Sequence, residues 1–187
     1  MYLAEVVYDK EGTLVVKSKN IPTNLLNEIR RFCLSEVETI SIEDVNFIEN
    51  TSILSDEMVA HRLGLLPLKQ DVQQTGNETS DINYVLNQVN NTSRVKIVFS
   101  DHLKTNGEIV PISGIPITKL YPGESIKLTC ITKKGQGKTH SKYCPFSSSI
   151  VVKDKDLNFL KLESDYMDPR SVLNQVITDM KLNIKLN

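Results

Sequence analysis

The chain has 187 residues, of which 40% are hydrophobic and 24% are charged, and it carries eight glycines and seven prolines. This composition excludes a disordered chain and predicts one domain or two small ones with a core that needs no disulfides or metals. Lysine and arginine number 22 against 23 acidic residues, so the net charge of -1 argues against a free-standing nucleic-acid-binding protein.

Cysteine spacing and hydropathy indicate the cellular compartment in which the protein is found. The three cysteines, Cys33, Cys130 and Cys144, are far apart and form no C-x-x-C pair, which predicts neither a zinc site nor a disulfide framework. The amino terminus lacks the basic and apolar regions of a secretory signal, and no apolar stretch approaches the length of a membrane span. We therefore expect an intracellular protein with no membrane segment, metal or other cofactor.

The first part of the chain predicts a hairpin, a helix and a strand. Residues 2–8 and 13–19 are strand-like and flank a turn that contains glycine. Pro22 suits the first turn of a helix, and apolar residues recur at helical spacing as far as Val37. Residues 40–48 alternate well enough to form a strand.

A second helix and a set of short strands follow. Ser55 suits an N-cap ahead of two acidic residues, and the helix should run to about Leu63 and end at Gly64. Residues 69–81 hold a single sizeable apolar residue and predict a surface loop. Further strands are predicted at residues 94–99, 109–112, 126–132, 149–152 and 158–162.

The last helix is predicted to begin at Asp168 and Pro169, a cap followed by proline at the first helical position. Residues 180–186 alternate and fit a strand as well as a helix end. If the termini meet, the two terminal helices form a small unit on a short sheet. Such a unit either exposes apolar helix surface to a partner or packs both helices on its own chain, and the pattern favours neither.

Residues 132–139 (TKKGQGKT) resemble a phosphate-binding loop and follow a predicted strand. That loop requires a helix directly after it, whose first amides hold the phosphates. Pro145 lies where the helix would run, and Thr132 replaces the Ala or Gly that begins the motif. A P-loop-type nucleotide-binding protein, with Lys138 as its lysine, is therefore only the alternative function.

Two groups of basic residues have a structural and a functional interpretation. Six lysines, His140 and no acid lie between Glu124 and Asp154, which is typical of a solvated face but also fits docking onto an acidic partner. Arg30 and Arg31 lie on the polar side of the first helix, either as surface residues or as donors to a partner's carboxylates. No arrangement of histidine, carboxylate and nucleophile predicts an active site.

Three stretches resemble signature blocks of the alpha-type subunits of RNA polymerase. Residues 27–37 (NEIRRFCLSEV) look like the first signature helix, and residues 50–68 (NTSILSDEMVAHRLGLLPL) resemble the most diagnostic block. Residues 120–130 (LYPGESIKLTC), continuing through Gly135 to His140, are similar to a later block. The form is that of the third-largest subunit of eukaryotic RNA polymerase II and of its archaeal counterpart. The resemblance covers nearly the whole chain.

The resemblance implies an α+β fold with two domains, like the amino-terminal domain of alpha subunits. Residues 1–39 with 154–187 would form a dimerisation domain, a helix pair on a sheet, and residues 40–153 an inserted, mainly β domain. It also implies a non-catalytic assembly subunit of a multisubunit DNA-directed RNA polymerase, with the active site in other chains. The chain would form a heterodimer with a small alpha-like subunit. That pair would be the platform for the large catalytic subunits in transcription, with DNA reached only through the complex.

The resemblance also implies two sets of partner-binding residues. The terminal helices would present an apolar set to the small alpha-like subunit: Leu25, Leu26, Ile29, Phe32, Cys33, Val172, Leu173, Val176, Ile177 and Met180. A mainly polar set would dock the second-largest subunit: Arg30, Arg31, Asp56, Glu57, His61, Arg62 and Gly64. A charge introduced by Ile29→Glu or Phe32→Glu is then expected to abolish pairing.

The chain departs from the family in one stretch that bears on cofactors. Many eukaryotic and archaeal relatives carry a cysteine-rich insertion that binds zinc or an iron–sulfur cluster, whereas residues 69–93 contain no cysteine. Neither cofactor is therefore expected. The chain also lacks the long insertion and tail of the nuclear subunits, so it looks like a trimmed version that would suit a large DNA virus or another reduced genome. Its expected location is the site of transcription in the nucleus or cytoplasm, or the virion of such a virus.

Overall fold

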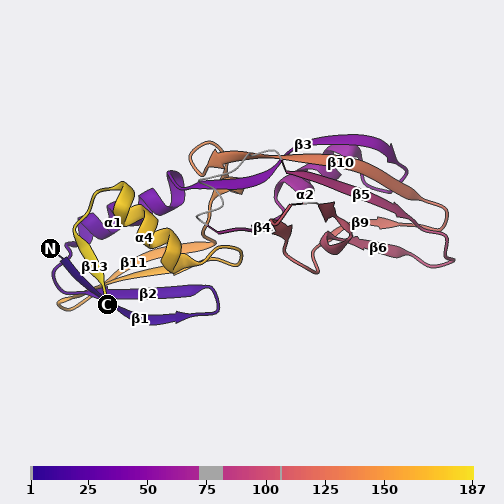
Figure 1. Cartoon of the computed structure of the whole chain (residues 1–187). Coiled ribbons are helices and arrows are strands. Elements are labelled where there is room, and N and C mark those ends of the chain that lie inside the picture. The colour runs from indigo at the N-terminus through magenta and orange to yellow at the C-terminus, as the bar shows by residue number, and fades with distance from the viewer. Residues whose placement is uncertain (1, 72–81, 106) are drawn as a thin grey trace. The chain divides into compact units, whose positions relative to one another are not determined.

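The computed structural model of the chain describes residues 2–71, 82–105 and 107–187. The chain forms two compact units, both drawn in Figure 1. Unit 1 takes its described residues from Met1–Thr39, Asp71–Gly76 and Gly135–Asn187, and unit 2 takes them from Ile40–Gln70 and Asn77–Lys134. Strands and helices are mixed, with more strand than helix, in agreement with the α+β class expected from the sequence.

Unit 1 contains a five-stranded sheet in the order β11-β12-β2-β1-β13. Its strands are β1 (Tyr2–Lys10), β2 (Thr13–Ser18), β11 (Ser148–Asp154), β12 (Leu157–Glu163) and β13 (Ile184–Leu186). β1 and β2 form the predicted antiparallel hairpin, whereas β13 lies parallel to β1. The alternating carboxy-terminal residues therefore end in a strand. Residues 135–153 group with unit 1, and β11, which begins at Ser148, pairs with β12 along its whole length. The domain boundary at 154 that the resemblance implies stays a prediction.

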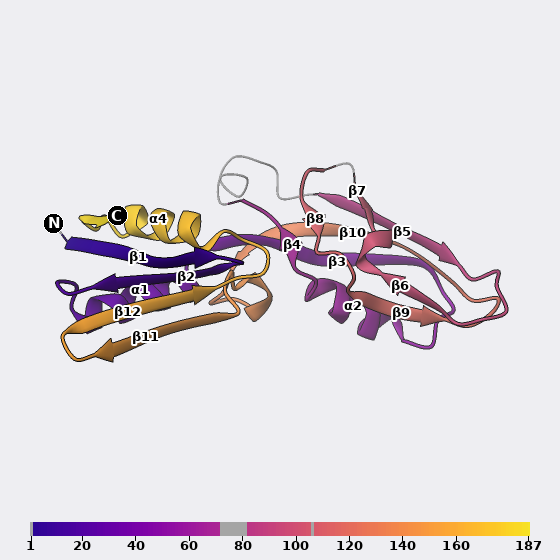
Figure 2. The ribbon, with the colours of Figure 1, turned by 90° about the horizontal axis from the view of Figure 1, so that it is seen from below.

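Two helices cover one face of this sheet, α1 (Thr23–Ser35) and α4 (Pro169–Asp179), and the view from below in Figure 2 has the sheet in front of α1. α4 begins as predicted, because Oδ2 of Asp168 accepts a hydrogen bond from the Ser171 amide at 3.0 Å. Pro22 lies at the N-cap of α1 rather than inside it, and among the described residues no side chain caps this end.

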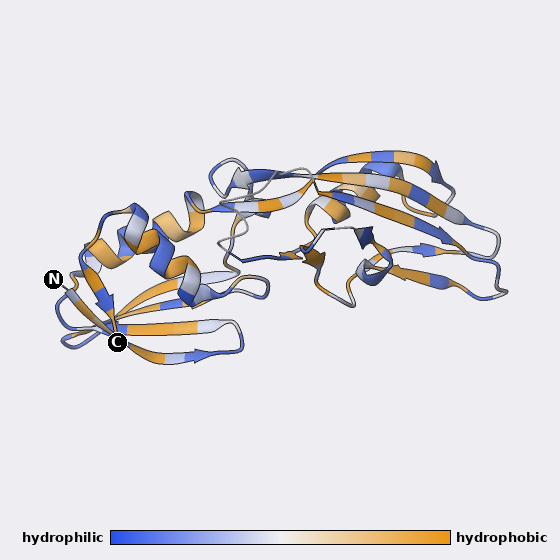
Figure 3. Cartoon of the chain, in the orientation of Figure 1, coloured by the Kyte–Doolittle hydropathy of each residue, from blue (hydrophilic) through white to orange (hydrophobic). Residues whose placement is uncertain are grey.

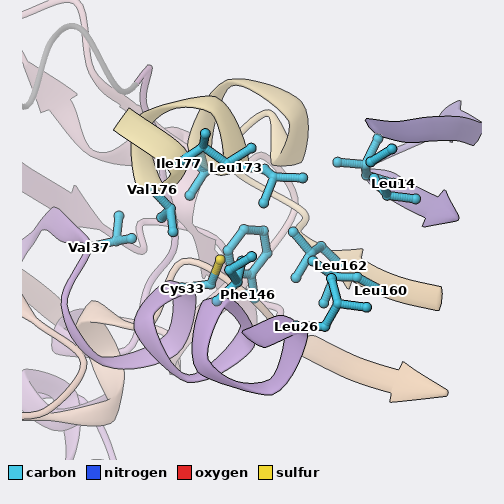
Figure 4. Close-up of a cluster of buried hydrophobic side chains, with 14 of the residues drawn as sticks. Leu14, Leu26, Cys33, Val37, Phe146, Leu160, Leu162, Leu173, Val176 and Ile177 are labelled. Atoms are coloured by element: carbon cyan, nitrogen blue, oxygen red, sulfur yellow. The ribbon is translucent and has the colours of Figure 1, made fainter. Parts of the chain in front are cut away.

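The core of unit 1 lies between the helices and the sheet. Alternate residues of β2 and β12, among them Leu14 and Leu160, point into it, as the period of a strand requires. Figure 4 shows these two leucines with Cys33 of α1, Leu173 of α4 and Phe146. Sequence segments from both ends of the chain therefore build one core.

Unit 2 is mainly β. Its four-stranded sheet has the order β3-β10-β5-β7, and the pairs β4-β8 and β6-β9 form two small sheets. The strands are β3 (Glu38–Asn50), β4 (Leu68–Lys69), β5 (Asn83–Val89), β6 (Lys96–Phe99), β7 (Lys104–Thr105), β8 (Val110–Pro111), β9 (Pro116–Leu120) and β10 (Ser125–Gln136). Hydrophobic and hydrophilic residues alternate along many strands of both units (Figure 3). The unit also contains α2 (Asp56–Gly64) and the 3-10 helix η1 (Ser100–His102).

The core of unit 2 includes one buried tyrosine. Tyr84 is 0% exposed, and its hydroxyl donates a hydrogen bond to the carbonyl oxygen of Ile109 at 2.7 Å. Burial raises the pKa of Tyr84 well above its usual range, so the hydroxyl stays a neutral donor at physiological pH. The buried phenol thus satisfies a carbonyl inside the core.

Two of the longer strands of unit 2 were not predicted from the sequence. β5 contains Asn83, Asn87 and Gln88, which are poor strand formers, and β9 begins with a proline. Both form because a partner strand is available: β5 pairs antiparallel with β10, and β9 with β6. The predicted loop over 69–81 begins inside β4, and residues 72–81 lie outside the described residues.

Two negative findings apply to the described residues. None of their helices is long and apolar enough to cross a membrane. Their His, Cys, Asp and Glu side chains form no group of three that could hold a metal ion.

Candidate partner-binding surfaces

α1 and α4, which the sequence predicts to face a small partner, bury most of their apolar side chains inside unit 1. The buried members of the predicted set are Leu26, Ile29, Cys33, Val172, Leu173, Val176 and Ile177. Each is at most 9% exposed, because the sheet and the other helix already cover it. Helical spacing identifies an apolar side but not what covers it, so the sequence grouped these core residues with accessible ones.

Three members of the predicted set are half-buried: Leu25, Phe32 and Met180. Leu25 and Phe32 lie seven positions apart, two helical turns, so they share one side of α1. The exposed Glu28 lies between them at the spacing of one turn. We call Leu25, Glu28 and Phe32 the α1 stripe. On this stripe, apolar atoms of α1 are still accessible to a partner.

The two arginines of α1 differ in exposure. Arg30 is half-buried, and its Nε donates a hydrogen bond to Oδ1 of Asn27 at 3.0 Å. Arg31 is exposed. An exposed guanidinium can donate to a partner's carboxylate or carbonyl groups without first leaving an internal contact.

α2 is held on unit 2 by one buried side. Val59 and Leu63 of this side are both 0% exposed. The end of the helix is tied down by the Ser41 hydroxyl, whose Oγ donates to the Gly64 carbonyl at 2.9 Å. Gly64 is the last residue of the helix, as the sequence predicted, and Leu65 follows it as the C-cap. The opposite side of α2 is therefore presented on a fixed support.

That opposite side combines apolar side chains with an arginine and a histidine. Met58, His61, Arg62 and Leu65 follow the i, i+3, i+4, i+7 spacing of one helix face. Met58 and Leu65 are 52% and 48% exposed, and Ile53 in the preceding turn is 66% exposed. We call these five residues the α2 face. The sequence assigned His61 and Arg62 to docking but missed the three apolar residues. Met58 and Leu65 could have been found from their spacing of two helical turns on the side away from Val59 and Leu63, whereas Ile53 precedes the helix and carries no such signal.

The polar residues of α2 make local contacts. Asp56 accepts a hydrogen bond from Nδ2 of Asn50 at 2.7 Å, and Nη2 of Arg62 donates to the Pro116 carbonyl at 2.6 Å. Ser55 occupies the N-cap as predicted, but its hydroxyl caps no amide of the helix. Hydrogen bonds from the Glu57 amide and from Ser55 lower the pKa of Glu57, so this carboxylate is charged at the positive end of the helix dipole.

Residues 132–139 do not form a phosphate-binding loop. β10 extends through Gln136, so the first part of the segment is an extended strand, and the short 3-10 helix η2 (Ser141–Tyr143) follows in place of an α-helix. The lysine of the motif, Lys138, pairs with Glu36, with 2.5 Å between Nζ and Oε2. The alternative function, a P-loop nucleotide-binding protein, therefore has no support.

The lysine run makes contacts within the chain. Nζ of Lys133 lies 2.7 Å from Oδ2 of Asp44, and the ammonium group of Lys142 lies 5.1 Å from the centre of the Tyr143 ring. Lys133 and Asp44 are both at least half exposed, so their pairing contributes little to stability. These contacts agree with the interpretation of the run as a solvated face.

Thiol reactivity is expected to be confined to one cysteine. Burial raises the pKa values of Cys33 and Cys130 to about 12, whereas Cys144 is partly exposed. At pH 8 only about one part in ten thousand of a thiol with that pKa is thiolate. Ellman's reagent should therefore label Cys144 in the native chain and all three cysteines after unfolding in guanidinium. Reaction of two or three thiols in the native chain would contradict the burial of α1 and β10.

Sequence comparison with known proteins identifies relatives of the chain. No protein-family model matches the chain. The chain is 32% identical over 171 residues to the DNA-directed RNA polymerase subunit Rpo3 of Methanocaldococcus jannaschii, an alignment that covers 91% of this chain and 86% of that protein. It is 34% identical over 163 residues to the DNA-directed RNA polymerase II subunit rpb3 of Dictyostelium discoideum, covering 75% of this chain and 54% of that protein.

A further archaeal relative agrees. The Rpo3 protein of Pyrococcus furiosus is 31% identical over 144 residues, covering 75% of this chain and 55% of that protein. The chain thus spans most of the Methanocaldococcus protein and about half of the other two relatives. A viral source stays a prediction. The 32% identity over 91% of this chain and 86% of the Methanocaldococcus protein confirms the resemblance drawn from the signature blocks, and the chain belongs to the family of the Rpo3 and Rpb3 subunits of DNA-directed RNA polymerase.

Proposed function

We propose that this chain is a non-catalytic assembly subunit of a multisubunit DNA-directed RNA polymerase. The observation that carries the proposal is the alignment with an archaeal Rpo3 protein over 91% of this chain and 86% of that protein. In this role the chain contributes surfaces rather than chemistry. Nucleotidyl transfer and its metal ions belong to other chains of the complex, and the location is the site of transcription.

We propose further that unit 1 is the dimerisation domain and pairs with a small alpha-like subunit. The helices of this domain are those predicted from the sequence. Their buried residues stabilise unit 1, so we assign the contact with the partner to their accessible residues. The half-buried Leu25 and Phe32 of the α1 stripe, with Met180 after α4, are the accessible apolar atoms that support this assignment. Unit 2 is then the inserted domain of the alpha-subunit-like fold.

Docking of the second-largest subunit is proposed at the α2 face and at the arginines of α1. The α2 face supports this proposal because it places two half-exposed apolar residues, Met58 and Leu65, beside the cationic Arg62 and the imidazole of His61. Protein interfaces commonly combine an apolar centre with polar and cationic side chains at its margin. Arg31 on α1 offers an exposed guanidinium for the same class of partner.

The experiment that tests the proposed function is a pull-down of the tagged chain from its native source at moderate salt, followed by mass spectrometry. We expect two very large polymerase chains and one small alpha-like chain in stoichiometric amounts. Recovery of the tagged chain alone, soluble and monodisperse, would contradict the assembly role. A matched pull-down of an unrelated tagged protein of similar size identifies chains that bind the resin.

A further inference from the structure

The segment that resembles a phosphate-binding loop lies against the carboxy-terminal end of α1. The backbone amide of Lys138 donates to the Ser35 carbonyl at 3.1 Å, and Nε2 of Gln136 donates to the Glu36 carbonyl at 3.0 Å. The last carbonyls of a helix lack partners within the helix and must be satisfied from outside. The segment thus supplies two donors to the end of α1 and to its C-cap residue.

The contact between Gly137 and α1 leaves no room for a side chain. A Cβ added to Gly137 would lie 1.9 Å from the Leu34 carbonyl oxygen, where real contacts are rarely shorter than 3.0 Å. The backbone of the segment therefore touches the backbone of the last helical turn directly. This is a sterically specified contact, since only glycine allows the two chains to approach so closely.

Charge adds to this contact. The first turn of α1 contains no acidic residue and its last turn no basic residue, so neither terminal turn carries a charge that favours the helix dipole. Nζ of Lys138 lies 2.5 Å from Oε2 of Glu36, the C-cap residue, and places a cation at the negative end of that dipole. The cation that the last turn of α1 lacks is therefore supplied from a residue about a hundred positions away in sequence.

The segment is itself a folded unit that also holds the residues after α1. The Thr139 amide and hydroxyl donate to the Gln136 carbonyl at 2.9 and 2.7 Å. Further along, the Tyr143 carbonyl accepts a hydrogen bond from Oγ1 of Thr39 at 2.8 Å. Residues 135–143 thus contact the chain from the last turn of α1 to the start of β3. We call residues 135–143 the clasp.

We propose that the clasp sets the position of the last turn of α1, and with it Phe32, for pairing with the small subunit, and that Gly137 and Lys138 are its positioning residues. The Glu36 amide donates to the Phe32 carbonyl at 3.0 Å, so Phe32 belongs to the same hydrogen-bonded turn that the clasp holds. The pairing part rests on the proposed function. The GQGK sequence, residues 135–138, is part of the clasp. It therefore contacts the end of a helix in its own chain rather than a nucleotide.

Gly137→Ala tests the steric contact. A methyl group there must push the clasp and the Leu34 carbonyl apart by about 1 Å, which frees the last turn of α1. The control is Gly12→Ala in the β1–β2 turn of the same unit, where the added Cβ would lie 2.1 Å from the Ser164 carbonyl oxygen. It introduces a comparable clash with a carbonyl and, because Gly12 has a φ of +72°, additional backbone strain, but it does not touch α1. Both variants are compared at a temperature well below their unfolding transitions.

Two measurements test separately whether the clasp holds the last turn of α1 and whether this turn affects pairing. Hydrogen exchange of the isolated chain reports opening of the last turn of α1, and we expect the Glu36 amide to exchange at least about tenfold faster in Gly137→Ala and unchanged in Gly12→Ala. The small chain that co-purifies with the tagged protein reports pairing, and we expect about tenfold weaker retention in Gly137→Ala alone.

The salt bridge gives a second test by charge exchange. Lys138→Glu places two carboxylates at the negative end of α1 and should weaken retention of the small chain a few-fold, since exposed ion pairs contribute little. The double exchange Lys138→Glu with Glu36→Lys restores opposite charges and should recover most of the loss. Recovery of this kind distinguishes positioning from a general loss of stability, which a second substitution would increase.

The outcomes decide the proposal. Unchanged exchange of the Glu36 amide in Gly137→Ala would overturn the clasp itself. Faster exchange with undiminished pairing, or equal loss of the small chain in both glycine variants, would overturn its role in positioning. If the wild-type chain recovers no small subunit, the proposed function fails, while the exchange measurement still decides whether the clasp holds α1.

Discussion

Replacing Phe32 by glutamate is expected to leave unit 1 folded and to remove the small alpha-like subunit. Phe32 is half-buried on the α1 stripe, so a carboxylate there stays hydrated in the free chain. Against an apolar partner surface the same carboxylate would lose its water without gaining a counter-charge. We expect pairing at least about thirtyfold weaker, which corresponds to ~2 kcal/mol and to a typical interface hot spot.

Ile29→Glu, which the sequence predicted to act in the same way, is instead expected to prevent folding. Ile29 is 1% exposed and packs in the core between α1, α4 and the sheet. An unpaired carboxylate buried there costs more than about 4 kcal/mol, a large part of the stability of a small unit. Ile29 and Phe32 belong to the same apolar pattern of α1, but a charge at Ile29 is expected to affect folding and a charge at Phe32 to affect pairing.

Circular dichroism melts and co-purification of the small chain check both variants. Asn24→Glu, at an exposed position in the first turn of α1, is the control for the added charge. It should leave pairing unchanged and should not lower the melting temperature, because an acid at the positive end of the helix dipole is favourable. Retention of the small chain by Phe32→Glu at the wild-type level would exclude the α1 stripe as the pairing surface. A cooperative, wild-type-like melt of Ile29→Glu would contradict its place in the core.

Leu63→Ala is expected to lower the free energy of unfolding of unit 2 by about 2–5 kcal/mol, because Leu63 is 0% exposed and its loss leaves a cavity under α2. Met58→Glu, on the α2 face of the same helix, should change that free energy by less than about 0.5 kcal/mol, since Met58 is 52% exposed. In the pull-down, however, Met58→Glu should lose the second-largest subunit while keeping the small one.

Urea unfolding of the purified chain and the pull-down measure these two effects separately. Lys119→Glu on β9 of unit 2 is a charge control at an exposed position outside the α2 face. If Met58→Glu retains the second-largest subunit as the control does, the docking surface lies elsewhere. If Leu63→Ala unfolds at the wild-type urea concentration, α2 is not anchored through Leu63.

Local sequence patterns predicted much of the secondary structure, because each relevant signal acts within a few residues. The hairpin around Gly12, the cap of α4 at Asp168 and the end of α2 at Gly64 all follow from the chemistry of single turns. β5 and β9 could not be found in this way. Asparagines interrupt β5 and a proline begins β9, so their local signals are weak, and pairing with β10 and β6, distant in sequence, stabilises them.

The sequence by itself also determined the family, because the 27–37 and 50–68 blocks combine residue identity with spacing. Only the tertiary structure decided which apolar residues of α1 are core and which are accessible, since helical spacing records a side of the helix and not its neighbours. The same holds for residues 132–139. Their glycines and lysine match a phosphate-binding loop locally, but the extended β10 and the carbonyl of Leu34 beside Gly137 assign them to the end of α1. Contacts between segments distant in sequence carry this information, and a local pattern cannot contain it.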